Sequence, residues 1–424
     1  MDKVVSKATK PLVANITVPA DKSVAHRSVI LASLSNGKSV IKNFPSAKDP
    51  LSTLNVCASL GIDYKFSENS LQIISNADLT VPTNVLDCGN SGTTMRLMAG
   101  VLAGQNFNSK LVGDESLSAR PMKRIIEPLT LMGAQIKSIN NTAPLEITGC
   151  ELSAIKYSSP IASAQVKSAI LLAGLFADGE TSIAEPYLSR NHTELMLQSM
   201  GANIKINQNT VSIQKSDLTP LNIELMGDIS SAAYFIAAAL IVPKSKIIIR
   251  NVGLNPTRTG VIDVLKKMGA NIEVLDLKTI ANEPVGDIKV TYSELNACEI
   301  SGELIPKLID EIPVLAVVAT QANGTTIIKD ATDLRNKESD RIKAIVTELK
   351  KLGANLEETS DGMIIHGKTK LTGDTCCETY HDHRIAMSLY IAGLISEKNI
   401  SINDFEWVNI SFPEFEKTFD KILE

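Results

Sequence analysis

The feature that most restricts the fold is a repeated pattern: a start of small or polar residues, then an apolar helix, then a stop of glycine or polar residues. The pattern occurs six times, at steps of 65 to 82 residues. Repetition at a nearly fixed period indicates one supersecondary unit used several times, so it constrains the fold before any motif is considered. Taking one residue for each, the starts are Lys22, Asn90, Ser163, Asp228, Asp310 and Asp382.

A second signature keeps nearly the same period. Leu-Gly or Met-Gly followed by Ile or Ala occurs at residues 60–62, 132–134, 200–202, 268–270 and 352–354. It ends an amphipathic helix and precedes alternating residues that are typical of a half-buried strand. The helices after the starts, such as 166–176, 232–241 and 312–319, are apolar on nearly every face and should be buried.

Each unit should therefore be α/β, with one exposed amphipathic helix and one central helix. Three units can share a core of three buried helices, so six units predict two similar domains. We place residues 21–237 in one domain and residues 1–20 with 238–424 in the other.

Composition excludes several classes of protein. The net charge of −5 argues against a nucleic-acid-binding surface. No uninterrupted apolar run approaches the ~18 residues of a membrane span, and residues 1–7 lack the pattern of a targeting peptide, so we expect none. The six cysteines form no CxxC pair, which fits a reduced cytoplasmic compartment better than a zinc site or a disulfide framework.

The first helix start carries Lys22 and Ser23, with Arg27 about one turn later. Cations at a helix N-terminus oppose the helix dipole, and a bound dianion would explain them. A solvated basic turn is the alternative. Cations recur at or near other starts of this acidic chain, which favours one or two small polyanionic ligands; these residues are Lys22, Arg27, Arg96, Arg120, Lys337, Arg341 and Arg384.

The second start, Gly89-Asn90-Ser91-Gly92-Thr93-Thr94, offers glycines and hydroxyls that suit an oxyanion, although a tight strand-to-helix turn would have the same composition. Asp310 and Glu311 precede a wholly apolar helix, either as a helix cap or as a buried proton-transfer group. Glu338 and Arg341 are spaced as a surface ion pair. His381 and His383 lack a third ligand, so a metal site is disfavoured.

Taken together, these segments resemble the EPSP synthases, the 3-phosphoshikimate 1-carboxyvinyltransferases, along essentially the whole chain. Gly-Asn-Ser-Gly-Thr-Thr at 89–94 and Ala-Ser-Ala-Gln-Val-Lys-Ser at 162–168 are similar to the class II branch. The resemblance implies two domains, each of three βαβαββ units around buried parallel helices, with ligands in a cleft between the domains. It implies a cytoplasmic monomer that needs no metal or organic cofactor.

The resemblance also implies the ligand contacts. Those to shikimate-3-phosphate would be Lys22, Ser23, Arg27, Ser163, Gln165, Asp310 and Lys337. Those to phosphoenolpyruvate would be Lys22, Gly92, Arg120, Gln165, Arg341 and Arg384. The 5-hydroxyl of shikimate-3-phosphate would add to phosphoenolpyruvate, and phosphate would leave the tetrahedral adduct. Asp310 would take the hydroxyl proton, and Glu338 or Lys22 would manage the proton at carbon.

One position departs from the class I pattern, because Ile410 stands where a lysine precedes Ser-Phe-Pro. Arg190, in a class II-like segment, is a further candidate contact. The nearest alternative is a UDP-N-acetylglucosamine enolpyruvyl transferase, but that family typically has a cysteine in the loop that here spans 111–122, where none occurs. A non-catalytic anion-binding scaffold would gain nothing from the carboxylates of Asp310 and Glu338.

Overall fold

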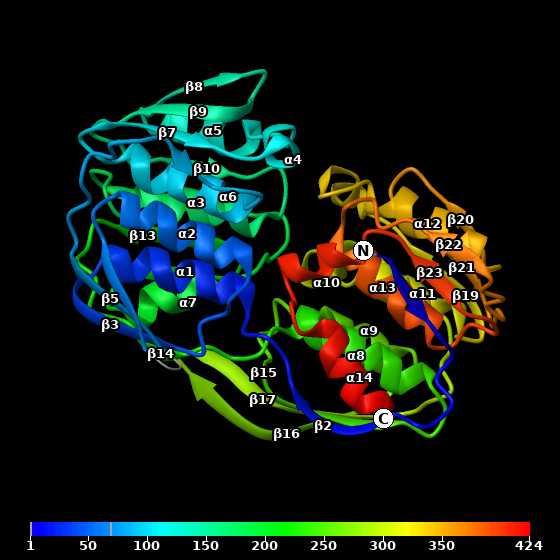
Figure 1. Cartoon of the computed structure of the whole chain (residues 1–424). Coiled ribbons are helices and arrows are strands. Elements are labelled where there is room, and N and C mark those ends of the chain that lie inside the picture. The colour runs from blue at the N-terminus through cyan, green and yellow to red at the C-terminus, as the bar shows by residue number, and fades with distance from the viewer. Residues whose placement is uncertain (1, 68–69) are drawn as a thin grey trace. The chain divides into compact units, whose positions relative to one another are not determined.

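The computed structural model describes residues 2–67 and 70–424, which form an α/β protein of two compact units (Figure 1). Unit 1 comprises Met1–Pro19, Met226–Lys278 and Pro284–Glu424, and unit 2 comprises Ala20–Leu225 and Thr279–Glu283. Residue 237, where the sequence analysis divides the chain, lies inside helix α8 (Ile229–Ile241), which belongs wholly to unit 1. All of α8 is buried, so the chain passes between the units before this helix and not within it.

The described residues form six mixed sheets, three in each unit. In strand order, those of unit 2 are β14 (Asn222–Glu224), β3 (Asn36–Lys42), β5 (Ser70–Asn76), β4 (Asp63–Ser67); β6 (Leu86–Asp87), β7 (Asn108–Val112), β9 (Thr142–Thr148), β8 (Gln135–Ile139); and β10 (Lys156–Ser158), β11 (Glu180–Ala184), β13 (Thr210–Gln214), β12 (Ile204–Asn207). Those of unit 1 are β16 (Asn271–Ile280), β17 (Glu283–Thr291), β15 (Lys246–Gly253), β2 (Val13–Thr17); β18 (Glu299–Ile300), β19 (Gly324–Ile328), β21 (Met363–Gly367), β20 (Asn355–Glu358); and β1 (Lys3–Val5), β23 (Ile400–Ile402), β22 (Thr375–Cys377).

A single register pattern recurs among the sheets. In the sheet of β10, the pair β10–β11 is parallel, whereas β11–β13 and β12–β13 are antiparallel. The sheets of β6, β14 and β18 repeat this pattern. A parallel pair needs a crossover connection, and the crossover from β10 to β11 contains helix α6 (Ala164–Gly174). The predicted order βαβαββ is therefore confirmed, for example in β10-α6-β11-α7-β12-β13.

The helices fall into the two classes that the sequence predicts. The buried helices are α1 (Lys22–Ser33), α3 (Gly92–Ala103) and α6 in unit 2, and α8, α11 (Ile312–Thr320) and α13 (His383–Gly393) in unit 1. The more exposed helices are α2 (Lys48–Ser59), α5 (Lys123–Leu131), α7 (His192–Ser199), α9 (Gly260–Lys267), α12 (Arg341–Lys351) and α14 (Phe415–Leu423). Short helices α4 (Glu115–Ser118) and α10 (Ile305–Leu308) lie in connections, as do 3₁₀ turns at Gly302–Leu304, Thr332–Asn336 and Phe405–Ile410.

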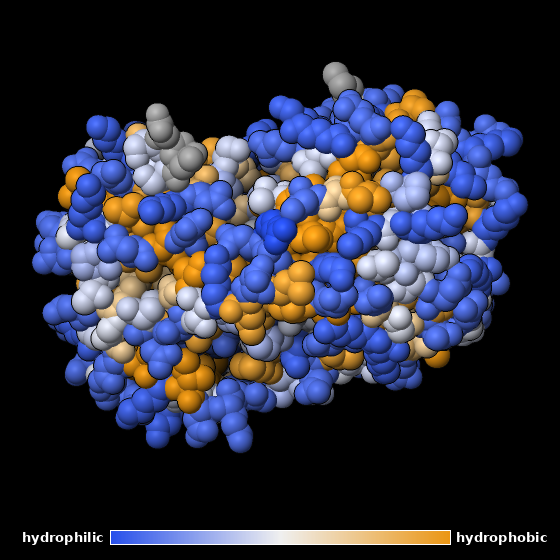
Figure 2. Space-filling view, turned by 90° about the horizontal axis from the view of Figure 1, so that it is seen from below, coloured by the Kyte–Doolittle hydropathy of each residue, from blue (hydrophilic) through white to orange (hydrophobic). Residues whose placement is uncertain are grey.

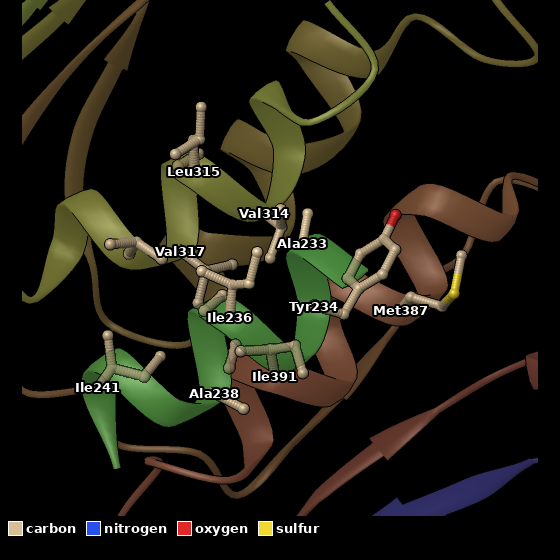
Figure 3. Close-up of a cluster of buried hydrophobic side chains, with 14 of the residues drawn as sticks. Ala233, Tyr234, Ile236, Ala238, Ile241, Val314, Leu315, Val317, Met387 and Ile391 are labelled. Carbon is tan, nitrogen blue, oxygen red and sulfur yellow. The ribbon is translucent and has the colours of Figure 1, made fainter. Parts of the chain in front are cut away.

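The core of unit 1 is built from α8, α11 and α13, which all contact one another. Figure 3 shows Ile236 of α8, Val314 and Val317 of α11 and Ile391 of α13 among the packed side chains. Every residue of these three helices is buried, including their polar ends. Polar groups in a core require partners, so the ends of these helices are where charged side chains must meet.

Close packing in unit 2 depends on a glycine. A Cβ added at Gly100 of α3 would lie 2.2 Å from the carbonyl oxygen of Ala169 in α6, so only glycine permits this approach. The two helices pack directly against each other, and α3 also contacts α1. The first turns of α1, α3 and α6 are thereby fixed within one unit.

The chain's last helix adds an aromatic cluster to unit 1. Phe415 and Phe419 of α14 pack on Phe235 of α8 and Tyr390 of α13, with ring centroids 4.4 Å apart for Phe235 and Phe419. Phe412, in the Ser-Phe-Pro segment that follows Ile410, contacts Phe235 as well. This segment therefore anchors α14 on the core.

The surface agrees with the composition. On the face in Figure 2, hydrophilic residues surround separate hydrophobic patches. Within residues 2–67 and 70–424, no helix has the length and apolar character needed to cross a bilayer.

Candidate active site

Helix α1 begins at Lys22 and is capped by Asp21, whose carboxylate accepts a 2.9 Å hydrogen bond from the Val24 amide. The Lys22 ammonium lies 3.1 Å from Asp49 Oδ2 at the start of α2, and its side chain is 21% exposed. Because the cap is supplied by Asp21, the lysine is not needed to complete the helix. It remains a partly exposed cation at a helix N-terminus, which is the arrangement expected for binding an anion.

Arg27, one turn further along α1, is held by the protein on several sides. Its Nε donates to Thr193 Oγ1 at 2.7 Å, Nη2 donates to Ser168 Oγ at 2.9 Å and Nη1 donates to the Ser23 carbonyl at 3.0 Å. The side chain is buried. These hydrogen bonds fix the guanidinium against α6 and α7. Ser168 and Thr193 carry no pattern in the sequence that marks them as partners of Arg27.

A buried chain of hydrogen bonds joins the starts of α1 and α3 through α2. His26 Nδ1 lies 2.6 Å from Thr53 Oγ1, which lies 2.7 Å from Thr94 Oγ1. Thr94 Oγ1 donates to Ser91 Oγ at 2.7 Å, and Ser91 caps α3. Burial, followed by the charges of Lys22 and Arg27, lowers the pKa of His26 well below 6.5. His26 is therefore a neutral structural link between the two helix starts.

Gly92, the first residue of α3, lies beside two arginines. A Cβ built there would lie 2.9 Å from Arg96 Nη1 and 3.6 Å from Arg120 Nη1. Arg120 is oriented by Asn90, whose Oδ1 accepts from Nη2 at 2.6 Å. Two guanidinium groups and the α3 N-terminus thus meet at Gly92, where the helix dipole and the arginines both favour an anion.

The start of α6 belongs to the same group of residues. Gln165 Oε1 accepts a 2.6 Å hydrogen bond from Arg96 Nη1, and its Nε2 donates to Thr93 Oγ1 at 3.0 Å. Ser163 occupies the N-cap position, but its hydroxyl makes no cap hydrogen bond. Its backbone amide instead donates to Glu185 at 2.9 Å, and the hydroxyl is not used as a helix cap.

The carboxylate that holds Ser163 is itself fixed by a buried lysine. Lys167 Nζ lies 2.8 Å from Glu185 and 2.8 Å from Glu194, and all three side chains are almost fully buried. Glu185 also accepts a hydrogen bond from the Ser189 hydroxyl at 2.9 Å. This ion triad orders the start of α6 and the segment that contains Arg190.

In unit 1, the predicted site residues meet around Arg341, the first residue of α12. Arg341 Nε donates to Asp382 Oδ2 at 2.8 Å, Nη1 donates to Asp310 Oδ1 at 3.1 Å and Nη2 donates to Glu338 Oε2 at 2.6 Å. A longer bond runs from Nη2 to Asp382 Oδ1 at 3.3 Å. The Glu338–Arg341 pair is therefore part of a buried network and not a solvated surface pair, since the Arg341 side chain is 1% exposed.

The other cations of unit 1 surround Asp310. Lys337 Nζ lies 3.8 Å from Asp310 Oδ1, and Arg384 Nη2 lies 3.8 Å from Asp310 Oδ2. Arg384 Nη1 also donates to the Asp310 carbonyl at 3.2 Å. Glu311 occupies the N-cap position of α11 but makes no side-chain cap hydrogen bond, so the helix-cap interpretation is wrong for Glu311. Asp310 lies among three cations.

Burial and charge act against each other in this cluster. Burial lowers the pKa of Arg341, but the negative charges of Asp382, Glu338 and Asp310 raise it by a larger amount, so the net shift is upward. Burial also lowers the pKa of Arg384. The negative charge of Asp310 raises it, and the net shift is again upward. The pKa of Lys337 is lowered, chiefly by burial. The two arginines stay charged at any physiological pH, whereas Lys337 loses its proton more easily than an ordinary lysine.

The segment before α13 is shaped by His381 and by Tyr380, which the sequence did not single out. Tyr380 and His381 both have left-handed backbones, with φ of 53° and 56°. The Tyr380 hydroxyl donates to the buried Glu348 of α12 at 2.7 Å, and the His381 ring stacks on Trp407 at 4.8 Å. Such backbones are costly for non-glycine residues, and these contacts hold the turn that leads to Asp382.

The described part of the chain holds no group of three His, Cys, Asp or Glu side chains arranged to bind a metal. The sequence-predicted residues instead gather in two clusters, one in each unit. In unit 1, ion pairs directly connect Asp310, Lys337, Glu338, Arg341 and Arg384. In unit 2, Gln165, Gly92 and Arg120 gather around Arg96, while Lys22, Ser23, Arg27 and Ser163 lie at the starts of α1 and α6.

Comparisons with known proteins identify the family. A model of the family described as EPSP synthase (3-phosphoshikimate 1-carboxyvinyltransferase) matches residues 6–419. The 3-phosphoshikimate 1-carboxyvinyltransferase of Thermodesulfovibrio yellowstonii is 54% identical over 424 residues, covering 98% of both chains. That of Bacillus licheniformis is 49% identical over 418 residues, covering 97% of this chain and 98% of the relative.

Solved structures agree. The structure of EPSP synthase from Acinetobacter baumannii matches with a TM-score of 0.89 at 40% identity, covering 99% of this chain and 98% of that one. The enolpyruvyl transferase NikO of Streptomyces tendae matches with a TM-score of 0.80 at 16% identity, over 99% of this chain and 97% of that one, which shows a shared fold. The family match, the close relatives and the fold lead to one conclusion: this chain belongs to the EPSP synthase family, the 3-phosphoshikimate 1-carboxyvinyltransferases.

Proposed function

We propose that this chain transfers the enolpyruvyl group of phosphoenolpyruvate to the 5-hydroxyl of shikimate-3-phosphate. The products are 5-enolpyruvylshikimate-3-phosphate and phosphate, in the shikimate pathway to aromatic amino acids. Membership of the EPSP synthase family supports the reaction. The observation that carries it is Asp310, a buried carboxylate 3.1 Å from Arg341 and 3.8 Å from both Lys337 and Arg384. A simple anion-binding site gains nothing from a carboxylate there, whereas an acid–base reaction on an anionic substrate requires one.

In this proposal shikimate-3-phosphate is bound by cations and hydroxyls at helix starts. Lys22 and Arg27 bind its negative charges, and the hydroxyl of Ser163 is well suited because it is not used as a helix cap. The pre-fixed guanidinium of Arg27 loses little side-chain entropy when the ligand binds. The full proposed set is Lys22, Ser23, Arg27, Ser163, Gln165, Asp310 and Lys337.

Phosphoenolpyruvate is proposed to bind Lys22, Gly92, Arg120, Gln165, Arg341 and Arg384. Gly92 leaves room for an anion beside Arg120, because a side chain there would fill the space next to both guanidiniums. Four of the five N–H donors of Arg341 are used by carboxylates, which leaves one Nη1 donor for the substrate. Arg341 therefore contributes mainly a fixed positive charge.

The proposed chemistry is addition followed by elimination. The Asp310 carboxylate takes the proton of the 5-hydroxyl while the hydroxyl oxygen bonds to C2 of phosphoenolpyruvate. At the same time C3 of phosphoenolpyruvate gains a proton from Glu338 or Lys22. In the second step the C2–O bond to phosphate breaks, and C3 returns a proton to the residue that supplied one, which restores the double bond. Arg341, Arg384 and Arg120 would stabilise negative charge on the adduct and on the departing phosphate.

The proposal also covers the oligomeric state and the cellular location of the enzyme. A cytoplasmic monomer fits the class of small, charged substrates and the scattered cysteines, which favour a reducing compartment. The alternative acceptor, UDP-N-acetylglucosamine, is not favoured, because the close relatives are 3-phosphoshikimate 1-carboxyvinyltransferases.

A phosphate-release assay tests the proposal. Purified protein is incubated with phosphoenolpyruvate alone, with added shikimate-3-phosphate, or with added UDP-N-acetylglucosamine. We expect phosphate release to depend on shikimate-3-phosphate. Release only with the sugar nucleotide would overturn the assignment, and equal release without an acceptor would indicate hydrolysis.

A further inference from the structure

The fourth helix start, at Asp228, has no role in the sequence analysis or in the proposed ligand sets. Asp228 caps α8, since its Oδ1 accepts a 2.8 Å hydrogen bond from the Ser230 amide. The same oxygen lies 3.0 Å from Arg258 Nη2, and the Arg258 side chain is 2% exposed. A capping aspartate does not need a buried arginine, so the cation indicates a further function for this helix start.

A hydroxyl connects this arginine to the next helix start. Arg258 Nη2 donates to Ser230 Oγ at 2.7 Å, and Ser230 Oγ in turn donates to Glu311 Oε1. Glu311 occupies the N-cap position of α11 but makes no side-chain cap bond there. Its carboxylate is therefore directed away from its own helix and toward α8.

The connection ends at Arg384, a residue that is proposed to bind substrate. Arg384 Nη1 lies 3.8 Å from Glu311 Oε1, the oxygen that Ser230 holds. Glu311 has a fully buried side chain, and a buried carboxylate is costly unless hydrogen bonds and a cation compensate it. Ser230 and Arg384 together provide that compensation, so the position of the Glu311 carboxylate and that of the Arg384 guanidinium depend on each other.

We propose that Ser230 and Glu311 are positioning residues for Arg384, held in turn by Arg258. The relay orders the guanidinium in the orientation that binds phosphoenolpyruvate. It makes the fourth helix start part of the site, although none of its residues needs to touch a substrate. This inference rests on the proposed function, because it assigns Arg384 to the enolpyruvyl donor.

The test compares Ser230→Ala with Ser231→Ala in steady-state transfer assays and in thermal unfolding. Ser231 is the matched control, because it is the next residue of the same buried helix turn. We expect Ser230→Ala to raise KM for phosphoenolpyruvate by about fivefold or more, the loss typical of one hydrogen bond, and to leave KM for shikimate-3-phosphate within twofold. Ser231→Ala should leave both constants within twofold.

A second variant tests the charge separately from the hydrogen bond. Glu311→Gln keeps an oxygen acceptor for Ser230 but removes a negative charge beside Arg384. Inorganic phosphate should then compete with phosphoenolpyruvate about threefold more strongly, with no change toward shikimate-3-phosphate. The two variants thus shift donor-site affinity in opposite directions, which a general loss of stability does not do.

The outcomes distinguish failure of the proposed function from failure of the positioning role alone. A wild-type protein that transfers no enolpyruvyl group refutes the proposed function itself. An active wild type overturns only the positioning role if Ser230→Ala changes both KM values by the same factor, matches Ser231→Ala, or changes only the melting temperature. A Glu311→Gln protein with unaltered phosphate inhibition counts against the relay in the same way.

Discussion

Arg341 and Asp382 are joined by a 2.8 Å hydrogen bond from Nε to Oδ2, and both side chains are buried. The same aspartate caps α13, because its Oδ1 accepts a 2.9 Å hydrogen bond from the Arg384 amide. The Arg341 charge counteracts the burial of Asp382, and the pKa of Asp382 is lowered overall. The Asp382 carboxylate therefore positions the side chain of Arg341 and the backbone of Arg384, which are both proposed to bind substrate.

Removing Arg341 should destabilise the protein. Arg341→Met leaves Asp382 buried without its main cation, and breaking a buried pair in this way costs about 3–5 kcal/mol. Urea unfolding should show this as a lower midpoint. Arg335→Met is the control: Arg335 also binds two carboxylates, Asp340 and Glu358, but is 25% exposed. Its loss should cost about 1 kcal/mol or less, and equal costs for the two variants would contradict the account of the cluster.

Asp310→Asn should keep substrate binding and lose most turnover. Asparagine retains an oxygen that accepts from Arg341, but it does not take up the hydroxyl proton. General-base contributions are typically about 10²–10⁴-fold, so kcat should fall within that range. Calorimetric titration with shikimate-3-phosphate should show affinity close to that of the wild type.

A surface aspartate serves as the control for Asp310. Asp374→Asn removes a carboxylate that is 70% exposed and paired with Lys398, and it should leave kcat unchanged. Near-normal turnover by the Asp310→Asn protein would remove Asp310 from its proposed role.

Lys22→Met should weaken both substrates. Charge-assisted hydrogen bonds contribute about 1.5–3 kcal/mol, so each dissociation constant should rise about tenfold or more. Lys110→Met, which removes an exposed cation paired with Glu146, should change neither constant. An unchanged affinity for either substrate in the Lys22→Met protein argues against a shared contact.

His26 should make stability depend on pH. Its pKa is lowered in the folded protein, so below about pH 6.5 the unfolded chain binds a proton that the folded protein does not. The free energy of unfolding therefore rises with pH across this range, by at most about 1.4 kcal/mol per pH unit, and is fully gained above pH 6.5.

Urea unfolding between about pH 5 and pH 8 measures this slope. His26→Asn, which keeps a polar atom near Thr53, should flatten it. His381→Asn, which changes a histidine that is 67% exposed, should not. An unaltered slope in the His26→Asn protein assigns the acid sensitivity to other groups.

Patterns of apolar residues predicted the fold well because burial leaves a direct trace in the sequence. Helices α8 and α11 are apolar all round, and the structure buries every one of their residues. The glycine after α12 was predicted as a helix stop, and Gly353 has the left-handed φ of 89° that such a stop requires.

The partners of the site residues could not be predicted in the same way. Glu348 of α12 holds Tyr380, which is 32 residues away, and Ser168 holds Arg27 across 141 residues. Such contacts depend on how helices pack, and nothing in the local pattern marks them. The same is true of Asp310, where the sequence allowed both a helix cap and a proton acceptor and gave no sign that Arg341 would lie 3.1 Å from its carboxylate.

The account depends most on which bond of phosphoenolpyruvate breaks. Addition and elimination break the C2–O bond, so the bridging oxygen leaves with phosphate. The direct measurement uses phosphoenolpyruvate labelled with ¹⁸O at that oxygen, together with shikimate-3-phosphate, and determines the mass of the released phosphate. We predict that the phosphate carries the label. Unlabelled phosphate, with the label retained in pyruvate, would contradict enolpyruvyl transfer and show attack at phosphorus instead.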